Sequence, residues 1–272
     1  MKVKTMLKKL LVSEELERYA ERVPHSLGSM GYDPWGLNMD TAKIGLAVLH
    51  WAFHHYFRVQ VTGLENVPTA GGALIISNHS GQLPTDGMMI GVAMATNPDG
   101  PRFPRAMVER FAFNLPYVGN LFTQLGSVVG DPENCIKMLK KGETVIVFPE
   151  GARGGGKIYK YRYQLQRFGT GFMHIAMASG VPIVPVGVVG GEETMPALIN
   201  IKPLARLLRW PSFPLAFPFP LPARMYINIG KPLSFPPNFT HESEVEANVE
   251  EVKKAIRALM DKGLSERKSI YL

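Results

Sequence analysis

Short apolar runs that alternate with helical patterns constrain the fold of this chain more than any other sequence feature. Ala73–Ser77 is a short, nearly continuous apolar run, which is typical of a strand buried on both faces of a parallel sheet. Strands that alternate with helices indicate a layered α/β architecture. We therefore predict an α/β fold with a mixed, largely parallel sheet flanked by helices. Further strands are predicted at Thr144–Phe148, Ile183–Val189 and Met225–Ile229, and helices at Met88–Ala95, Glu133–Lys140, Thr170–Ser179 and over the periodic apolar residues from Val245 to Leu259.

The first 58 residues have a different, mainly helical pattern. Apolar residues between Val3 and Leu11 recur at helical spacing with lysines between them, so this segment is either a membrane-surface helix or a short helix packed on the domain. Ser13 has the properties of an N-cap for a helix that runs to Val23. We predict an N-terminal helical, membrane-associating region over residues 1–58 and an α/β domain over residues 59–272, which together form effectively one structural domain.

The apolar run Ile44–Phe57 is the longest helical pattern in this region. Its fourteen residues are too few to cross a bilayer, which needs about 20, so we predict a buried or interfacial helix. His50 and His54 lie one helical turn apart, as two metal ligands could. No third ligand is evident, and the glutamate of an H-E-x-x-H motif is missing. We therefore predict no metal site here.

The charge distribution points to an anionic partner. The chain carries a net charge of +7, and residues 151–241 hold ten Lys or Arg residues but only two acidic residues, Glu192 and Glu193. Such a stretch suits a phosphate, an acidic carrier protein or an anionic membrane surface. The sequence contains no helix-turn-helix, zinc-finger or RNP-like pattern, so nucleic acid is not an expected partner. With a single cysteine, Cys135, the chain has no disulfide framework, and a reducing, cytosolic location is expected.

Two candidate catalytic residues follow the first predicted strand. His79 comes directly after that strand, and Asp86 opens the helical stretch seven residues later. Ligands of α/β sheets bind beyond the carboxyl ends of the strands, so His79 lies where a substrate would enter. A neutral histidine can accept a hydroxyl proton, and a carboxylate can fix its tautomer. Asp86 could equally be a cap of its helix, and the spacing leaves both roles open.

The second predicted strand is followed by the glycine-rich segment Phe148–Lys157. Gly151 and Gly156-Lys157 match most of a P-loop, but position 158 is Ile where Mg²⁺ binding requires Ser or Thr, so nucleotide binding is not expected. We interpret the segment as an anion cradle, in which Arg153 pairs with a phosphate, Lys157 adds charge and Glu150 accepts hydrogen bonds from substrate hydroxyl groups. The third predicted strand follows Pro182 and contains Pro185, and these prolines place it near a sheet edge or a bulge.

Together these motifs resemble those of the glycerolipid acyltransferases. The resemblance covers roughly residues 59–235 and rests on three elements, Asn78-His79 with a following Asp, Phe148-Pro149-Glu150-Gly151-x-Arg153, and Val181-Pro182-Ile183-Val184-Pro185. It implies an α/β acyltransferase on a membrane face, with His79 as general base, Asp86 as its partner, and Glu150, Gly151 and Arg153 holding the acceptor. The donor it implies is an acyl thioester, either acyl-CoA or acyl-carrier protein, and no metal or other cofactor is needed. Its expected location is the cytoplasmic face of a membrane, as a peripheral or monotopic protein.

Two departures from the family pattern bear on the acceptor. Six residues separate His79 from Asp86 where the family usually has four, so the pair must be joined by a wider loop. The intervening stretch Gly126–Asp131 lacks the arginine that usually helps to bind phosphate. The expected reaction is acyl transfer to a hydroxyl of a lysophosphatidate or related glycerolipid. A neutral lipid or glycolipid acceptor, and a non-catalytic lipid-binding protein, remain alternatives.

The segment Leu204–Pro222 is a candidate membrane contact. Its prolines forbid a continuous helix through the second half, and Trp210, Phe213 and Phe217 lie beside Arg206 and Arg209. Aromatic and Leu side chains next to arginines suit an interface with anionic lipid. A buried covering loop is the alternative.

Overall fold

The computed structural model describes residues 2–23, 27–81, 83–113, 117–208, 213–217, 219–237 and 241–271. Its strands are β1 (Gln60–Thr62), β2 (Ala73–Ser77), β3 (Arg105–Val108), β4 (Val128–Val129), β5 (Thr144–Val147), β6 (Ile183–Val189), β7 (Ala197–Asn200), β8 (Pro214–Ala216) and β9 (Tyr226–Ile229). Its α-helices are α1 (Lys2–Leu11), α2 (Glu14–Arg22), α3 (Met39–Trp51), α4 (Thr85–Ala95), α5 (Arg110–Phe113), α6 (Val118–Gln124), α7 (Pro132–Lys140), α8 (Ala152–Gly155), α9 (Gly171–Ser179), α10 (Gly191–Thr194), α11 (Lys202–Leu208) and α12 (Glu242–Glu266). A π-helix, η1 (Ala52–Tyr56), continues α3, and 3-10 turns lie at η2 (Leu64–Asn66) and η3 (Tyr159–Tyr161).

The main sheet has seven strands in the order β1-β9-β6-β2-β5-β3-β4. Strand β2 pairs in parallel with β5 on one side and with β6 on the other. Strand β9 is antiparallel to β6, and β1 follows β9 in parallel. The sheet is therefore mixed and largely parallel, as the alternation of apolar runs predicts. The four predicted strands are found within one residue of their expected bounds.

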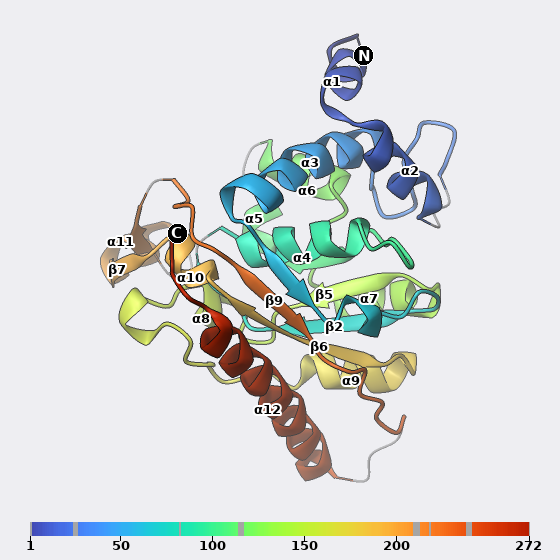
Figure 1. Ribbon diagram of the computed structural model, residues 1–272. Helices are drawn as coiled ribbons and strands as arrows, with labels where there is room; N and C mark the ends of the chain where they lie inside the picture. The colour runs from blue at the N-terminus through green and yellow to red at the C-terminus, as the bar shows by residue number, and fades with distance from the viewer. Residues whose placement is uncertain are drawn as a thin grey trace.

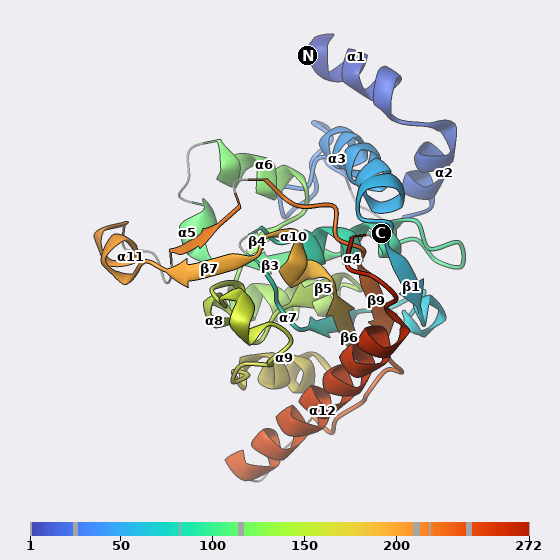
Figure 2. The same cartoon turned by 60° about the vertical axis from the view of Figure 1, so that its left-hand side comes forward.

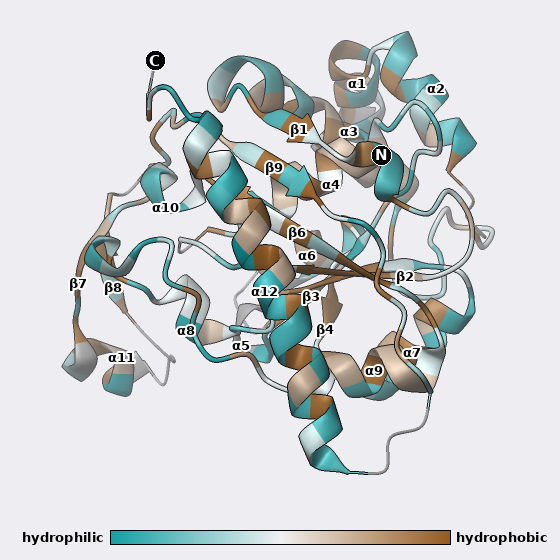
Figure 3. Ribbon diagram, turned by 60° about the horizontal axis from the view of Figure 1, so that its bottom comes forward, coloured by the Kyte–Doolittle hydropathy of each residue, from teal (hydrophilic) through white to brown (hydrophobic). Residues whose placement is uncertain are grey.

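Helices cover both faces of this sheet (Figure 1). Side chains alternate along β2, so Ile75 joins the core under α3 and α4, whereas Leu74 and Ile76 join the core under α7, α9 and α12. All three are fully buried, which explains why the β2 run is continuously apolar. Figure 3 shows the long helix α12 crossing its face of the sheet with hydrophobic and hydrophilic residues in turn. Its buried residues Val252 and Ile256 pack against the sheet.

The prediction that Pro182 and Pro185 place their strand at an edge or bulge is wrong. Strand β6 lies in the interior of the sheet, between β9 and β2. The prolines are tolerated because the pairing of β6 changes at this point. Ile183 forms a bridge with Leu233, and pairing with β9 begins only at Val186. Between them Pro185 acts as an acceptor, since its carbonyl binds the Gly230 N–H at 2.8 Å, and its missing N–H falls at the break.

The N-terminal helices are built onto the α/β core. Ser13 caps α2, as predicted, because its hydroxyl accepts the N–H of Leu16 at 3.3 Å. Leu46 of α3 and Phe53 of η1 belong to the same apolar cluster as β2 and α4. Helices α2, α3 and η1 thus share the core of the α/β domain, through Leu16 in the case of α2. Among the described residues, no helix combines the length and apolarity that crossing a bilayer requires.

The carboxyl ends of β2, β5 and β6 meet at one edge of the sheet. The His79 loop follows β2, the glycine-rich segment follows β5, and α10 with its two glutamates follows β6. The lone Cys135 lies elsewhere, buried in α7, where burial raises the pKa of its thiol to about 12. Cys135 is therefore a core side chain that stays protonated at neutral pH.

Candidate active site

Asn78 fixes the end of β2, and so places the following residue. Its side-chain amide donates to the Val188 carbonyl at 2.9 Å, and its side-chain oxygen accepts the Val188 N–H at 2.8 Å. The side chain thus pairs with β6 as a peptide group would and is completely buried. The chain is held rigidly to the last residue before His79.

His79 and Asp86 are brought into contact across the loop between them. Nδ1 of His79 lies 2.8 Å from Oδ2 of Asp86. That oxygen also accepts the Ser80 N–H at 2.8 Å, and Oδ1 accepts the Gly87 N–H at 2.8 Å, so backbone hydrogen bonds fix both oxygens of the carboxylate. Because a carboxylate only accepts, the Nδ1 proton belongs to this bond and Nε2 carries the free lone pair. Asp86 lies inside the first turn of α4, whose cap position is Pro84, so it is not the N-cap.

The surroundings of His79 favour its charged form. Burial, the largest influence, disfavours the charge, but the Asp86 carboxylate outweighs it and raises the pKa of His79 above its usual 6.5. The ring stacks on Phe148 with centroids 4.5 Å apart and keeps 19 % of its side chain exposed. A base of this kind is neutral, and able to accept a proton, only above that raised pKa.

Glu150 holds the main chain of His79. Its Oε1 accepts the His79 N–H at 3.0 Å and its Oε2 accepts the Gln166 N–H at 2.8 Å. The side chain is 1 % exposed. The sequence predicts that Glu150 accepts hydrogen bonds from the acceptor, whereas the structure commits one bond from each of its oxygens to the protein's own amides. Glu150 is thus a positioning residue for His79.

The glycines of the segment allow α8 to pack directly on His79. Gly151 has φ +56° and ψ −147°, a conformation open essentially to glycine alone. A Cβ on Gly154 would lie 2.9 Å from Cβ of His79, and one on Gly155 would lie 3.2 Å from Nε2. These two glycines form a wall beside the reactive nitrogen. The sequence shows the glycine run but not which of its members approaches the histidine.

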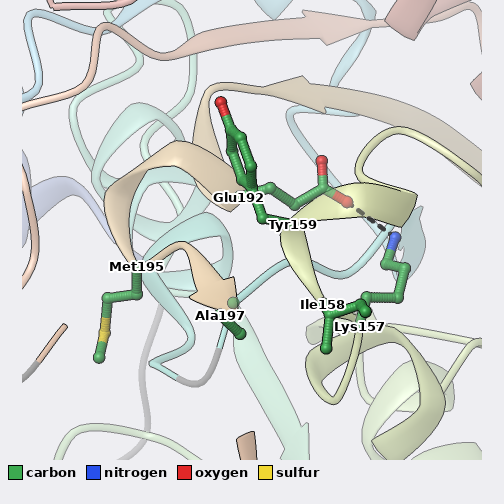
Figure 4. A pocket seen from close by; sticks show the side chains of 7 residues that line it. Lys157, Ile158, Tyr159, Glu192, Met195 and Ala197 are labelled. Atoms are coloured by element: carbon green, nitrogen blue, oxygen red, sulfur yellow. Dashed lines mark ion pairs between the residues drawn. The ribbon is translucent and has the colours of Figure 1, made fainter. Parts of the chain in front are cut away.

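Lys157 is buried and is not available to a ligand. This finding corrects the prediction that Lys157 adds positive charge to an anion cradle. Its side chain is 4 % exposed, and Nζ lies 2.9 Å from Oε1 of Glu192 and 3.5 Å from Oε2 of Glu150. Figure 4 shows the Lys157–Glu192 ion pair in the wall of a small pocket. That pocket is also lined by Gly81 of the His79 loop and by Met195 and Ala197. With both carboxylates as partners, Lys157 neutralises the protein's own charge.

A second buried hydrogen-bond network links Glu192, through Tyr163 and Glu193, to Arg267 in the C-terminal segment. Glu192 Oε2 accepts the Tyr163 N–H at 3.0 Å. Glu193 accepts the Tyr163 hydroxyl and, at 2.8 Å, the Arg267 guanidinium. Tyr163 has φ +62°, a left-handed conformation that this network holds in place. Burial, with Glu193 next, raises the pKa of Tyr163, so it remains a hydrogen-bond donor. None of these residues except the two glutamates stands out in the sequence.

Arg153 differs from Lys157 in being exposed beside the site. It lies in α8, and its guanidinium makes a 3.4 Å bond to the Arg167 carbonyl. Within the described residues this long bond is the one hydrogen bond of its guanidinium, so most of its donors are accessible to an anionic group. Of the two basic residues predicted for the cradle, Arg153 is thus the one placed to meet a ligand.

The histidines of α3 and η1 lie on another part of the molecule. The Nε2 atoms of His50 and His54 are 3.0 Å apart, and their rings meet edge to face. Burial, with His54 next, lowers the pKa of His50. The described residues include no group of three or more His, Cys, Asp or Glu side chains that could hold a metal ion.

Similar proteins identify the class of this domain. Residues 58–189 match the family model described as Acyltransferase, so this part of the chain is an acyltransferase domain, as the resemblance in its motifs implies. The fold is that of a solved structure, the 1-acyl-sn-glycerophosphate (LPA) acyltransferase PlsC from Thermotoga maritima. The two share 23% sequence identity with a TM-score of 0.57, over 85% of this chain and 80% of that one.

Relatives by sequence are found in bacteria and in animals. A protein of Mycobacterium leprae is 38% identical over 219 residues, which cover 77% of this chain and 59% of the relative. A protein of Mycobacterium tuberculosis is 37% identical over 77% of this chain and 60% of its own length. The human DGAT1/2-independent enzyme synthesizing storage lipids is 28% identical over 82% of this chain and 67% of its own length. The chain thus spans about three fifths of the length of the mycobacterial relatives it matches.

Replacing Asp86 by asparagine tests the pair through its pH dependence. The change removes the carboxylate that raises the pKa of His79 and leaves burial to lower it. We expect kcat/KM to fall about 10²-fold or more, because the amide no longer fixes the Nδ1–H tautomer. We also expect the acidic limb of the pH–rate profile to move to lower pH. A full-rate Asp86→Asn enzyme with an unmoved profile would leave Asp86 as a structural residue of α4.

Proposed function

We propose that this protein transfers a fatty acyl group from a thioester to a hydroxyl group of a glycerolipid. The observation that carries the proposal is the His79–Asp86 contact of 2.8 Å at the carboxyl end of β2. It leaves the Nε2 lone pair for a substrate hydroxyl, beside the glycine wall of α8. The Acyltransferase family match supports the same reaction class.

In the proposed reaction His79 acts as a general base. Nε2 accepts the proton of the acceptor hydroxyl while the hydroxyl oxygen attacks the thioester carbonyl carbon. The tetrahedral intermediate collapses by breaking the carbon–sulfur bond, and the imidazolium returns its proton to the thiolate. Asp86 stabilises the imidazolium between these steps. An ester and a free thiol are the products, and the histidine ends as it began.

The proposed acceptor is a lysophosphatidate or a related glycerolipid, with a neutral lipid as the second candidate. Exposed Arg153 beside the site favours a phosphate. The burial of Lys157 removes the second cation expected there and favours a neutral acceptor. The name of the human relative, an enzyme synthesizing storage lipids, supports the neutral candidate as well.

Arg153→Ala distinguishes the two acceptors. If the acceptor carries a phosphate, we expect its KM to rise about tenfold or more while the KM of the thioester stays unchanged, because a charged hydrogen bond is lost. Arg153→Lys should restore only part of the loss, since lysine lacks the planar fork. Equal effects on phosphorylated and neutral acceptors would favour the neutral lipid.

Release of free thiol is the direct test of the proposed activity. Purified protein is given acyl-CoA or acyl-carrier protein with a panel of lysophosphatidate, diacylglycerol and glycolipid acceptors. Acceptor-dependent thiol release, with the acylated lipid as product, is the expected result. Binding of these lipids without thiol release from either donor would identify a non-catalytic lipid-binding protein instead.

We also propose that the protein acts as a peripheral or monotopic protein on the cytoplasmic face of a membrane. Helix α1 supports this, because Val3, Met6 and Leu10 are each more than 60 % exposed and alternate with lysines. An amphipathic helix of this composition suits the surface of an anionic bilayer. A lipid acceptor would reach the active site from that surface.

A further inference from the structure

Residues 195–220 leave the α/β body and return to it. Strand β7, helix α11 and strand β8 lie in this excursion, which we call the β7–β8 limb. Figure 2 shows β7 and α11 projecting away from the main sheet. The two ends of the limb are tied together, because the Leu221 N–H donates to the Thr194 carbonyl at 2.6 Å. The Tyr56 hydroxyl donates to the Pro220 carbonyl at 2.6 Å and fastens the base to η1.

The limb exposes large apolar side chains on the part that the structure describes. Leu207 is 78 % exposed and Phe219 is 77 % exposed, and Phe217 is half exposed. Leu198 and Ile199 are neighbours in β7 and both are exposed, at a point where the pairing register with β8 shifts. Figure 3 shows hydrophobic colour along β7. A two-stranded ribbon is at best marginally stable alone in water. Exposed apolar side chains that cluster in this way mark a surface that binds another apolar surface.

The charges of the limb indicate what kind of surface would cover its apolar side chains. Its sequence holds Lys202, Arg206 and Arg209 and no acidic residue. Arg206 is exposed on α11, next to Leu207. Apolar side chains beside cations, with no anion, are complementary to the headgroup region of a bilayer that contains anionic lipid. Trp210, predicted from the sequence to take part, lies outside the described residues.

The base of the limb opens beside the candidate active site. Met195 and Ala197 line the small pocket shown in Figure 4, together with Gly81 of the His79 loop. Gly81 is two residues from His79, and its carbonyl lies beside Gly155 of the glycine wall. The exposed apolar surface of β7 therefore begins where the pocket ends. A lipid that leaves the bilayer along the limb would arrive at this pocket, beside the loop that carries His79.

From this arrangement we propose that the β7–β8 limb inserts its apolar side chains into an anionic membrane leaflet and guides the lipid acceptor to His79. This inference rests on the proposed function for the identity of the guided molecule. Membrane contact through the limb is inferred from the exposure, charge and position of its residues and does not depend on the proposed function. It adds to α1 a second lipid contact, whose base lies beside the His79 loop.

Vesicle sedimentation with a limb variant tests the proposal. Leu207→Ser combined with Phe219→Ser removes two side chains that are each more than 75 % exposed. Leu27→Ser combined with Met30→Ser is the matched control on the loop between α2 and α3. We expect wild type to sediment with vesicles of phosphatidylcholine and phosphatidylglycerol, more weakly at high salt. The limb variant should bind at least about tenfold more weakly, and the control variant should bind as wild type does.

A thiol-release assay distinguishes a loss of membrane binding from a loss of catalysis. With a short-chain acyl-CoA and a soluble short-chain acceptor, the limb variant should keep the wild-type rate. With a long-chain acceptor embedded in vesicles, its rate should fall in step with binding. Undiminished vesicle binding by the limb variant, or binding of acyl-carrier protein in place of vesicles, would overturn the proposal. Wild-type vesicle binding without any thiol release would instead contradict the proposed function and leave the membrane contact standing.

Discussion

His79→Ala is expected to lower the rate of acyl transfer about 10²- to 10⁴-fold without unfolding the protein. The loss follows because alanine has no group that could accept the hydroxyl proton in place of Nε2, which lies beside Gly155 of the glycine wall. The remaining activity would come from holding the two substrates together. The measurement is kcat/KM for thiol release above the raised pKa of His79, where the wild-type ring is neutral.

The main-chain contacts of His79 make this variant a fair test. Glu150 binds the N–H of residue 79, and Asn78 fixes the strand end before it, so both contacts survive the loss of the ring. His79→Gln keeps more of the packing on Phe148 and should be equally inactive, because an amide is no base. His55→Ala changes an exposed histidine of η1, outside the His79 loop and the glycine wall, and should leave the rate unchanged. A folded His79→Ala protein with the wild-type rate would refute the general-base mechanism.

The sheet could be predicted because burial on both faces leaves a direct mark on sequence. Strands β2, β5 and β6 are apolar at nearly every position, and such runs are short and distinct. The place of β6 in the sheet could not be predicted in this way. A proline usually indicates an edge, but here the change of partner from Leu233 to β9 spares the missing N–H. That change of partner depends on β9, whose residues lie about 40 positions further along the chain.

The site residues also differ in whether the local sequence or a distant segment determines their position. His79 and Asp86 were predictable because residues at strand ends gather at one edge of the sheet, and the longer loop between them still gives a 2.8 Å contact. The burial of Lys157 was not predictable from its own segment, because its partner Glu192 lies after another strand. A signal did exist. Glu192 and Glu193 are the sole acidic residues in positions 151–241, and both are buried against cations. Isolated acids in a basic stretch are thus candidates for structural ion pairs.

Lys157→Met is expected to destabilise the protein by about 3–5 kcal/mol. Methionine matches the length of the lysine stem but leaves the carboxylates of Glu150 and Glu192 without their shared cation. Both side chains are at most 5 % exposed, so water cannot replace the lost ion pairs. The measurement is the urea midpoint of unfolding. Arg153→Met, four residues earlier and exposed, is the matched control and should shift stability by no more than about 0.5 kcal/mol.

The pH dependence of this loss identifies its cause. Burial raises the pKa of Glu192 above its ordinary 4.5, and Lys157 opposes that rise, so the pKa rises further without Lys157. The folded variant then binds a proton that the unfolded chain releases, and its stability falls as the pH increases. The gap between Lys157→Met and wild type should therefore widen from about pH 5 to about pH 8. Adding Glu192→Gln, which keeps an acceptor for the Tyr163 N–H but removes the charge, should recover part of the loss. A constant gap at all pH values would mean that packing of the lysine stem, and not its charge, holds this network together.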